Sequence, residues 1–60
     1  MKIRVEIKND IMGDSVFWEG DSKHIMSIRN IPARNLAQDV ITDGKTRKQG
    51  MWVVSEIKEK

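Results

Sequence analysis

Apolar and polar residues alternate strictly at the start of the chain. Residues 2–8 read Lys-Ile-Arg-Val-Glu-Ile-Lys, so every second side chain is apolar. A period of two is typical of a strand that has one face on a core and the other in water. The pattern therefore predicts a half-buried strand over residues 2–8, whose inner face carries Ile3, Val5 and Ile7.

The segment after this strand combines turn chemistry with an apolar tip. Four residues there favour turns: Asn9, Asp10, Gly13 and Asp14. Ile11 and Met12 lie between them and make the tip a candidate contact site. Residues 15–19 then predict a second strand, and Gly20-Asp21 fits a two-residue hairpin turn.

A third strand is predicted over residues 23–30, returning from that hairpin. Alternation along it places His24, Met26 and Ile28 on one face and Ile25 on the other. Pro32 ends this strand, because proline suits the first turn of a helix and interrupts a sheet.

The pattern changes to a helical period after Pro32. The apolar positions recur at intervals of three and four, at Ala33, Leu36, Ala37, Val40 and Ile41. Gly44 is a typical residue for ending such a helix. Residues 45–50 indicate a polar connection, and residues 51–57 a last strand.

These elements predict an α+β fold in one domain over residues 1–60. Its order is β-β-β-α-β, with a small, mainly antiparallel sheet of about four strands and one helix packed on one face. A domain of 60 residues buries only about 60% of its unfolded surface, so its core is thin. We therefore expect a second copy, as a homodimer, or a partner to contribute to stability.

Composition narrows the functional classes. The chain has no Cys and no Tyr, and His24 is its only His. Metal sites and nucleophilic catalysis rely on converging Cys, His and carboxylate groups. Gly44-Lys45-Thr46 resembles the end of a phosphate-binding loop, but Asp39 stands where that pattern requires Gly. We expect a protein that is not an enzyme and that binds no cofactor and no metal.

Two of the predicted strands, unlike the strand over residues 2–8, do not keep their apolar residues on one face. Apolar side chains of residues 15–19 and 51–57 fall on both faces, whereas the helix can cover only one. Exposed aromatic residues are frequent anchors of interfaces. The pattern favours a small interaction protein that binds, and modulates or inhibits, a protein partner through an apolar sheet face made of Phe17, Trp18, Ile25, Trp52 and Val54.

The alternative function is a nucleic-acid-binding regulator. Its contacts would come from two basic groups, Arg29 with Arg34 beside Pro32, and Lys45, Arg47 and Lys48 in the polar connection. The net charge of +2, from 11 basic and 9 acidic residues, is too balanced to decide for nucleic acid. Salt dependence of binding separates the two functions.

The chain also predicts a cytoplasmic location without membrane insertion. Its longest wholly apolar run, residues 51–54, is far shorter than the roughly 18 residues that indicate a membrane span. Short cysteine-free proteins of this kind are frequent in phage and mobile-element genomes, and a phage origin is a further expectation.

Overall fold

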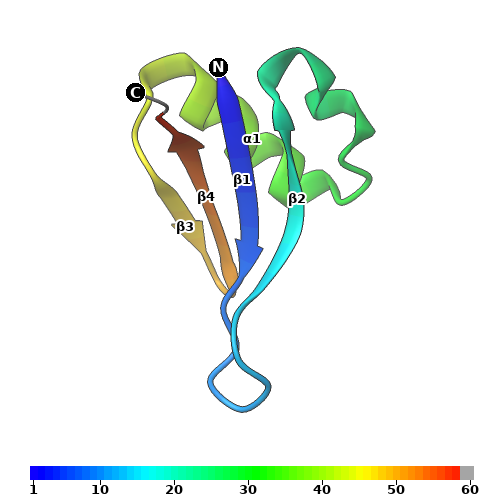
Figure 1. Cartoon of the computed structure of the whole chain (residues 1–60), viewed down its shortest axis with the longest axis vertical. Helices are drawn as coiled ribbons and strands as arrows, with labels where there is room; N and C mark the ends of the chain where they lie inside the picture. The colour runs from blue at the N-terminus through cyan, green and yellow to red at the C-terminus, as the bar shows by residue number, and fades with distance from the viewer. Residues whose placement is uncertain (59–60) are drawn as a thin grey trace.

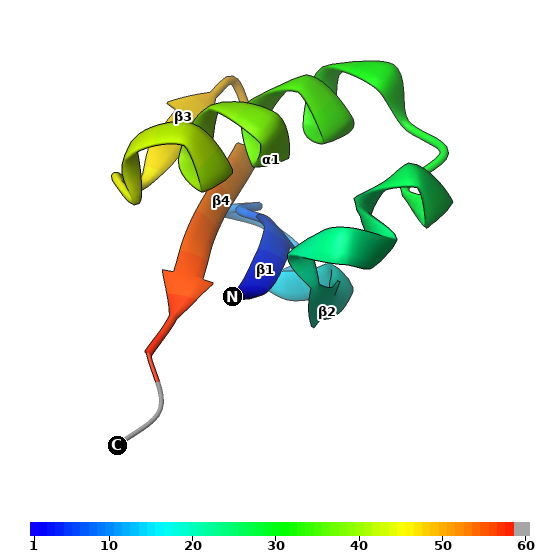
Figure 2. The same ribbon diagram turned by 90° about the horizontal axis from the view of Figure 1, so that it is seen from above.

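The computed structural model describes residues 1–58 of the chain, as a four-stranded antiparallel sheet with one helix on one face (Figures 1 and 2). The α+β fold class is confirmed. The elements are β1 (Lys2–Ile7), β2 (Ser15–Asp21), the 3-10 helix η1 (Ser22–Ser27), α1 (Ile31–Asp43), β3 (Arg47–Gln49) and β4 (Trp52–Ile57). The strands lie in the order β2-β1-β4-β3, so β2 and β3 form the edges.

The inner strand β1 supplies the middle of the core through Ile3 and Val5, as its alternation predicts, whereas the third predicted residue, Ile7, is only half-buried. Ile3 and Val5 are fully buried, and Val5 pairs with the equally buried Val54 of β4. These side chains meet the apolar face of α1, and Figure 2 shows the helix lying across the sheet. The small apolar core is therefore a single layer between α1 and the sheet.

The helix α1 also follows its sequence pattern. Ala33, Leu36, Ala37 and Val40 are its buried residues, and Gly44 ends it with a φ of 73° in the left-handed region. The start differs slightly from the prediction, since Ile31 already belongs to the helix. Asn30 precedes it, and its side-chain Oδ1 accepts a hydrogen bond from the backbone N–H of Ala33 at 3.1 Å, which is a standard N-cap contact.

The predicted strand over residues 23–30 is wrong, and so is the hairpin before it. Strand β2 continues through Gly20 and Asp21, and η1 follows. Ile25 and Ile28 are three residues apart, which is the repeat of a 3-10 helix, and both are buried in the core. The Asp21 carboxylate caps η1 by accepting a hydrogen bond from the N–H of Lys23. A local helix thus buries both isoleucines on one side, which a strand could not do.

The sheet has one strand that the sequence did not predict, β3, and it lies where the sequence indicated a polar connection. Residues Arg47–Gln49 form β3, which pairs with β4 along the outer edge of the sheet. Gly50, with a φ of 60°, follows β3 on the way to β4. An edge strand of three polar residues buries little apolar surface, so hydrophobic periodicity does not reveal it.

No helix among residues 1–58 is long and apolar enough to cross a membrane. Helix α1 has 13 residues, whereas a span needs about 20.

Candidate functional site

The structure separates the five residues predicted to form a protein-binding face. Val54 is fully buried and Ile25 is 9% exposed, so both belong to the core and cannot line an exposed face. Trp18 and Trp52 are half-buried and pack against that core. Phe17 is the exposed member of the five, with 44% of its surface in solvent. Most of the residues predicted to form an exposed apolar face therefore face the core instead.

A bulge in β2 explains the position of Phe17. The register between β1 and β2 shifts after Val5, so Val5 pairs with Trp18 and Glu6 with Val16, and Phe17 has no partner on β1. A bulge of this kind redirects a side chain out of strict alternation. The Phe17 ring lies edge-on to the Trp52 ring, with 4.9 Å between ring centroids. Phe17 therefore contacts Trp52, whereas the other predicted residues lie in the core or pack against it.

Other exposed apolar side chains gather at the same end of the sheet. We call this region the loop end and define it as Ile11, Met12, Val16, Phe17 and Met51, with Trp52 partly buried beneath. The backbone N–H of Lys8 donates to the carbonyl of Met51 at 2.8 Å, which holds the turn after β3 against the end of β1. In Figure 1 the loop between β1 and β2 projects from the bottom of the sheet. The loop end is thus a protruding apolar surface.

The tip of this loop has a defined conformation. The Asn9 side-chain Oδ1 accepts hydrogen bonds from the N–H groups of both Ile11 and Met12, each at 2.9 Å. The Gly13 N–H donates to the carbonyl of Asn9 at 2.9 Å, and the φ of 84° at Gly13 is one that glycine adopts without strain. The N–H groups of Ile11, Met12 and Gly13 are therefore satisfied within the loop, while the Ile11 and Met12 side chains remain 93% and 85% exposed.

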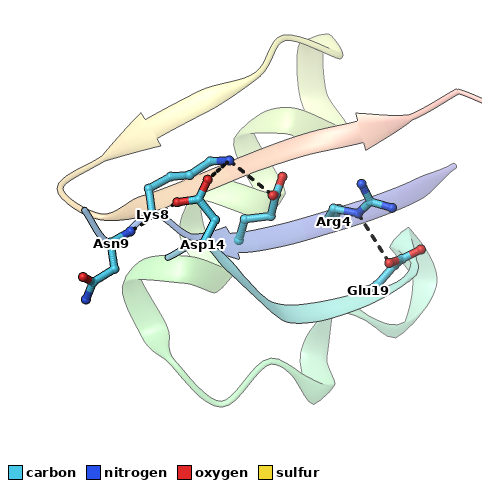
Figure 3. Close-up of polar contacts among 6 residues, drawn as sticks. Arg4, Lys8, Asn9, Asp14 and Glu19 are labelled. Atoms are coloured by element: carbon cyan, nitrogen blue, oxygen red, sulfur yellow. Dashed lines mark hydrogen bonds and ion pairs between the residues drawn. The ribbon is translucent and has the colours of Figure 1, made fainter. Parts of the chain in front are cut away.

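Charged residues fasten the base of the loop. The Lys8 ammonium lies 3.0 Å from Asp14 Oδ2 and 3.4 Å from Glu6 Oε2, and the Asn9 N–H donates to Asp14 Oδ1 at 3.3 Å (Figure 3). The hydrogen bond from Lys8 and that from the Asn9 backbone hold the pKa of Asp14 below its usual value. The same contacts with Asp14 and Glu6 raise the pKa of Lys8. Both shifts favour the charged forms that close the loop.

These contacts predict an acid-sensitive loop. The pKa of Asp14 is lower in the folded protein, so its contribution to stability is present above the ordinary carboxyl pKa of about 4 and is lost as the pH falls through the lower folded value. Asp14→Asn should therefore reduce stability at pH 7 and flatten the fall in stability below about pH 4. Thermal melts across this pH range measure both effects. Asp39→Asn, on the exposed side of α1, is the control, and an equal flattening in that variant would contradict the assignment to Asp14.

The residues of the nucleic-acid alternative do not form one patch. Arg29 precedes α1 and Arg34 lies in its first turn. The second group, Lys45, Arg47 and Lys48, follows the end of the helix. A helix of 13 residues is about 20 Å long, which separates the two groups. Within the second group, Arg47 forms an ion pair with Asp43.

Lys48 neighbours Arg47 on β3 and lies opposite Val53, whereas Arg47 lies opposite Val54. Because successive strand residues point to opposite faces, the two cations are directed to different sides of the sheet. The basic residues after α1 therefore do not present a single surface either.

A metal-binding cluster does not appear in the part of the chain that the structure describes. No group of three His, Cys, Asp or Glu side chains there could hold a metal ion, and no polar or charged residue is fully buried. His24 lies exposed on η1, where its carbonyl accepts a hydrogen bond from Ser27. The loop end is therefore the candidate site.

Sequence reasoning found part of this site. The turn pattern indicated the apolar tip at Ile11 and Met12, and aromatic content indicated Phe17 and Trp52. Val16 was missed, because its exposure follows from the β2 bulge, for which the sequence gives no local signal. Comparisons with protein-family models, with curated proteins and with solved structures found no match for this chain.

Proposed function

We propose that this protein is a small non-catalytic interaction protein that binds a protein partner through the loop end. The observation that carries the proposal concerns Ile11 and Met12. The Asn9 side chain holds their backbone in one conformation, and their apolar side chains are exposed to solvent. Full burial of each side chain would contribute about 1.5–3 kcal/mol to binding. A preorganised loop loses little conformational entropy on binding, so more of that contribution appears as affinity.

Charge supports a protein partner over a nucleic acid or an anionic membrane. Residues 6–14 contain three acidic side chains, Glu6, Asp10 and Asp14, and one basic side chain, Lys8, which gives a net charge of −2. Phosphate backbones and anionic lipid headgroups attract basic surfaces and repel this one. An apolar pocket on a protein fits the protruding tip, because anchors of this kind insert into desolvated cavities.

The proposal predicts that the tip is needed for partner capture. The double variant Ile11→Ser/Met12→Ser should recover at least about 30-fold less partner from the source cell than the unchanged chain, since interface anchors contribute about 2 kcal/mol or more. Its fold should persist, because substitutions of exposed residues change stability by about 0.5 kcal/mol or less. Quantitative affinity capture measures recovery, and circular dichroism checks the fold.

Met26→Ser is the matched control, because Met26 is an exposed apolar residue on η1, outside the loop end. It should not reduce partner recovery. Equal recovery with the double variant and the unchanged chain would refute the loop end as the binding site. Recovery of DNA or RNA that is lost on replacing Lys45, Arg47 and Lys48 by Ala would favour the nucleic-acid alternative instead.

A further inference from the structure

A second exposed apolar patch lies where η1 leads into α1. Met26 is 68% exposed and Ile31 is 51% exposed. Three basic residues accompany them, Lys23, Arg29 and Arg34, and we call these five residues the corner. Figure 1 shows this segment, in green, beyond β2. Within residues 1–58 two apolar patches thus lie outside the core, the loop end and the corner.

The two patches carry opposite charge. Residues 22–34, which include the corner, contain three basic and no acidic side chains, whereas residues 6–14 at the loop have a net charge of −2. No ion pair within residues 1–58 neutralises Arg29 or Arg34. Asp10, at the loop tip, also lacks such a partner in the described part of the chain. Each patch therefore has the chemistry that the other would recognise, an apolar centre with charges of the opposite sign.

Strand β2 runs along one edge of the sheet from the loop that follows β1 to the corner. It begins at the loop with Ser15 and ends at Asp21, where η1 starts. Its seven residues span about 23 Å. β2 is also an edge strand of the sheet, so no further strand among the described residues covers its outer side. Two molecules that lie antiparallel along this edge bring the loop of each to the corner of the other.

We propose that two copies of this chain associate along their β2 edges by a twofold axis, with the loop end of each copy on the corner of the other. The twofold arrangement is closed, because each patch meets its complement and none is left over. It also forms every contact twice, so a small patch on each copy contributes two contacts to the stability of the dimer. A standard interface buries about 800 Å² per partner, roughly one fifth of the 4381 Å² that this chain exposes.

This inference goes beyond the proposed function and can fail independently of it. Self-association needs the loop end and the corner, whereas capture of another protein needs the loop end alone. Because the dimer covers the loop end, a protein partner would compete with the second copy. Met26→Ser should therefore weaken self-association without reducing partner capture.

Sedimentation equilibrium of the full chain tests the mass. At about 50 µM and low salt we expect a dimer, and at about 1 M salt a shift toward monomer, since the screening length falls from about 10 Å at 0.1 M to about 3 Å. Asp10→Lys should weaken the dimer roughly tenfold or more, because the reversed contact occurs twice. Arg29→Glu should do the same. Asp39→Lys makes the same charge change on the exposed side of α1 and should leave the dimer unchanged.

Mixing the two variants gives the sharpest test. Each variant alone places like charges together at both contacts. In a mixed dimer, the loop of the Asp10→Lys copy would meet the corner of the Arg29→Glu copy, so the new lysine would face the new glutamate, and the remaining contact would be unchanged. An equimolar mixture of the two variants should therefore recover dimer. A monomer at low salt, a dimer insensitive to either variant, or a mixture without recovery would each overturn the proposal.

Discussion

Leu36→Ala is expected to lower the free energy of unfolding by about 2–5 kcal/mol, through lost burial and the cavity left behind. Leu36 lies on the buried stripe of α1 with 7% of its surface exposed. A domain of 60 residues has a total stability of about 3–9 kcal/mol. The variant should therefore lose about half of its stability, which a urea or thermal melt followed by circular dichroism measures.

Gln38→Ala is the control for this prediction. Gln38 is exposed on the same helix, and alanine favours helices at least as well, so its stability should stay within about 0.5 kcal/mol of the unchanged chain. Equal melts for the two variants would show that α1 is not docked on the sheet through Leu36.

Gly20→Val is the second change with a large expected effect. A Cβ at Gly20 would lie 3.0 Å from Cζ2 and 3.1 Å from Cη2 of the Trp18 ring. The ring cannot move freely, because its Nε1 donates to Ser27 Oγ at 2.9 Å. Overpacking of this kind typically costs about 1–3 kcal/mol. We expect a melting temperature lower by at least about 4 °C and a shift in tryptophan emission.

Ser15→Val is the matched control, since it adds the same side chain at an exposed position of the same strand. It should have little effect on the melt or on the emission. A Gly20→Val variant that melts like Ser15→Val would show that Trp18 does not cover Gly20.

The parts of the fold that the sequence predicted are those where one period runs through a whole element. Alternation over residues 2–8 identified the central strand, because β1 has the core on one face and water on the other. The spacing from Ala33 to Val40 identified α1, because a single helical stripe faces the sheet. In both elements the local pattern and the tertiary environment demand the same burial.

The parts that it missed depend on neighbours distant in the sequence. Ile25 and Ile28 fit a strand or a short helix equally well by composition, and contact with α1 and β2 decided for η1. Residues 47–49 form a strand only because β4 offers them a partner. The bulge at Phe17 likewise arises from the β1–β2 register.

The candidate site likewise has a part that the sequence predicted and a part that only the tertiary structure revealed. By itself the sequence determined the fold class, the inner faces of β1 and α1, and the apolar loop tip at Ile11 and Met12, because each depends on local spacing and turn chemistry. Only the tertiary structure decided that Val54 and Ile25 belong to the core and that Phe17 meets Trp52. A strand's two faces are equivalent in sequence when both carry apolar residues, and the packing of α1 on one of them makes that face the interior.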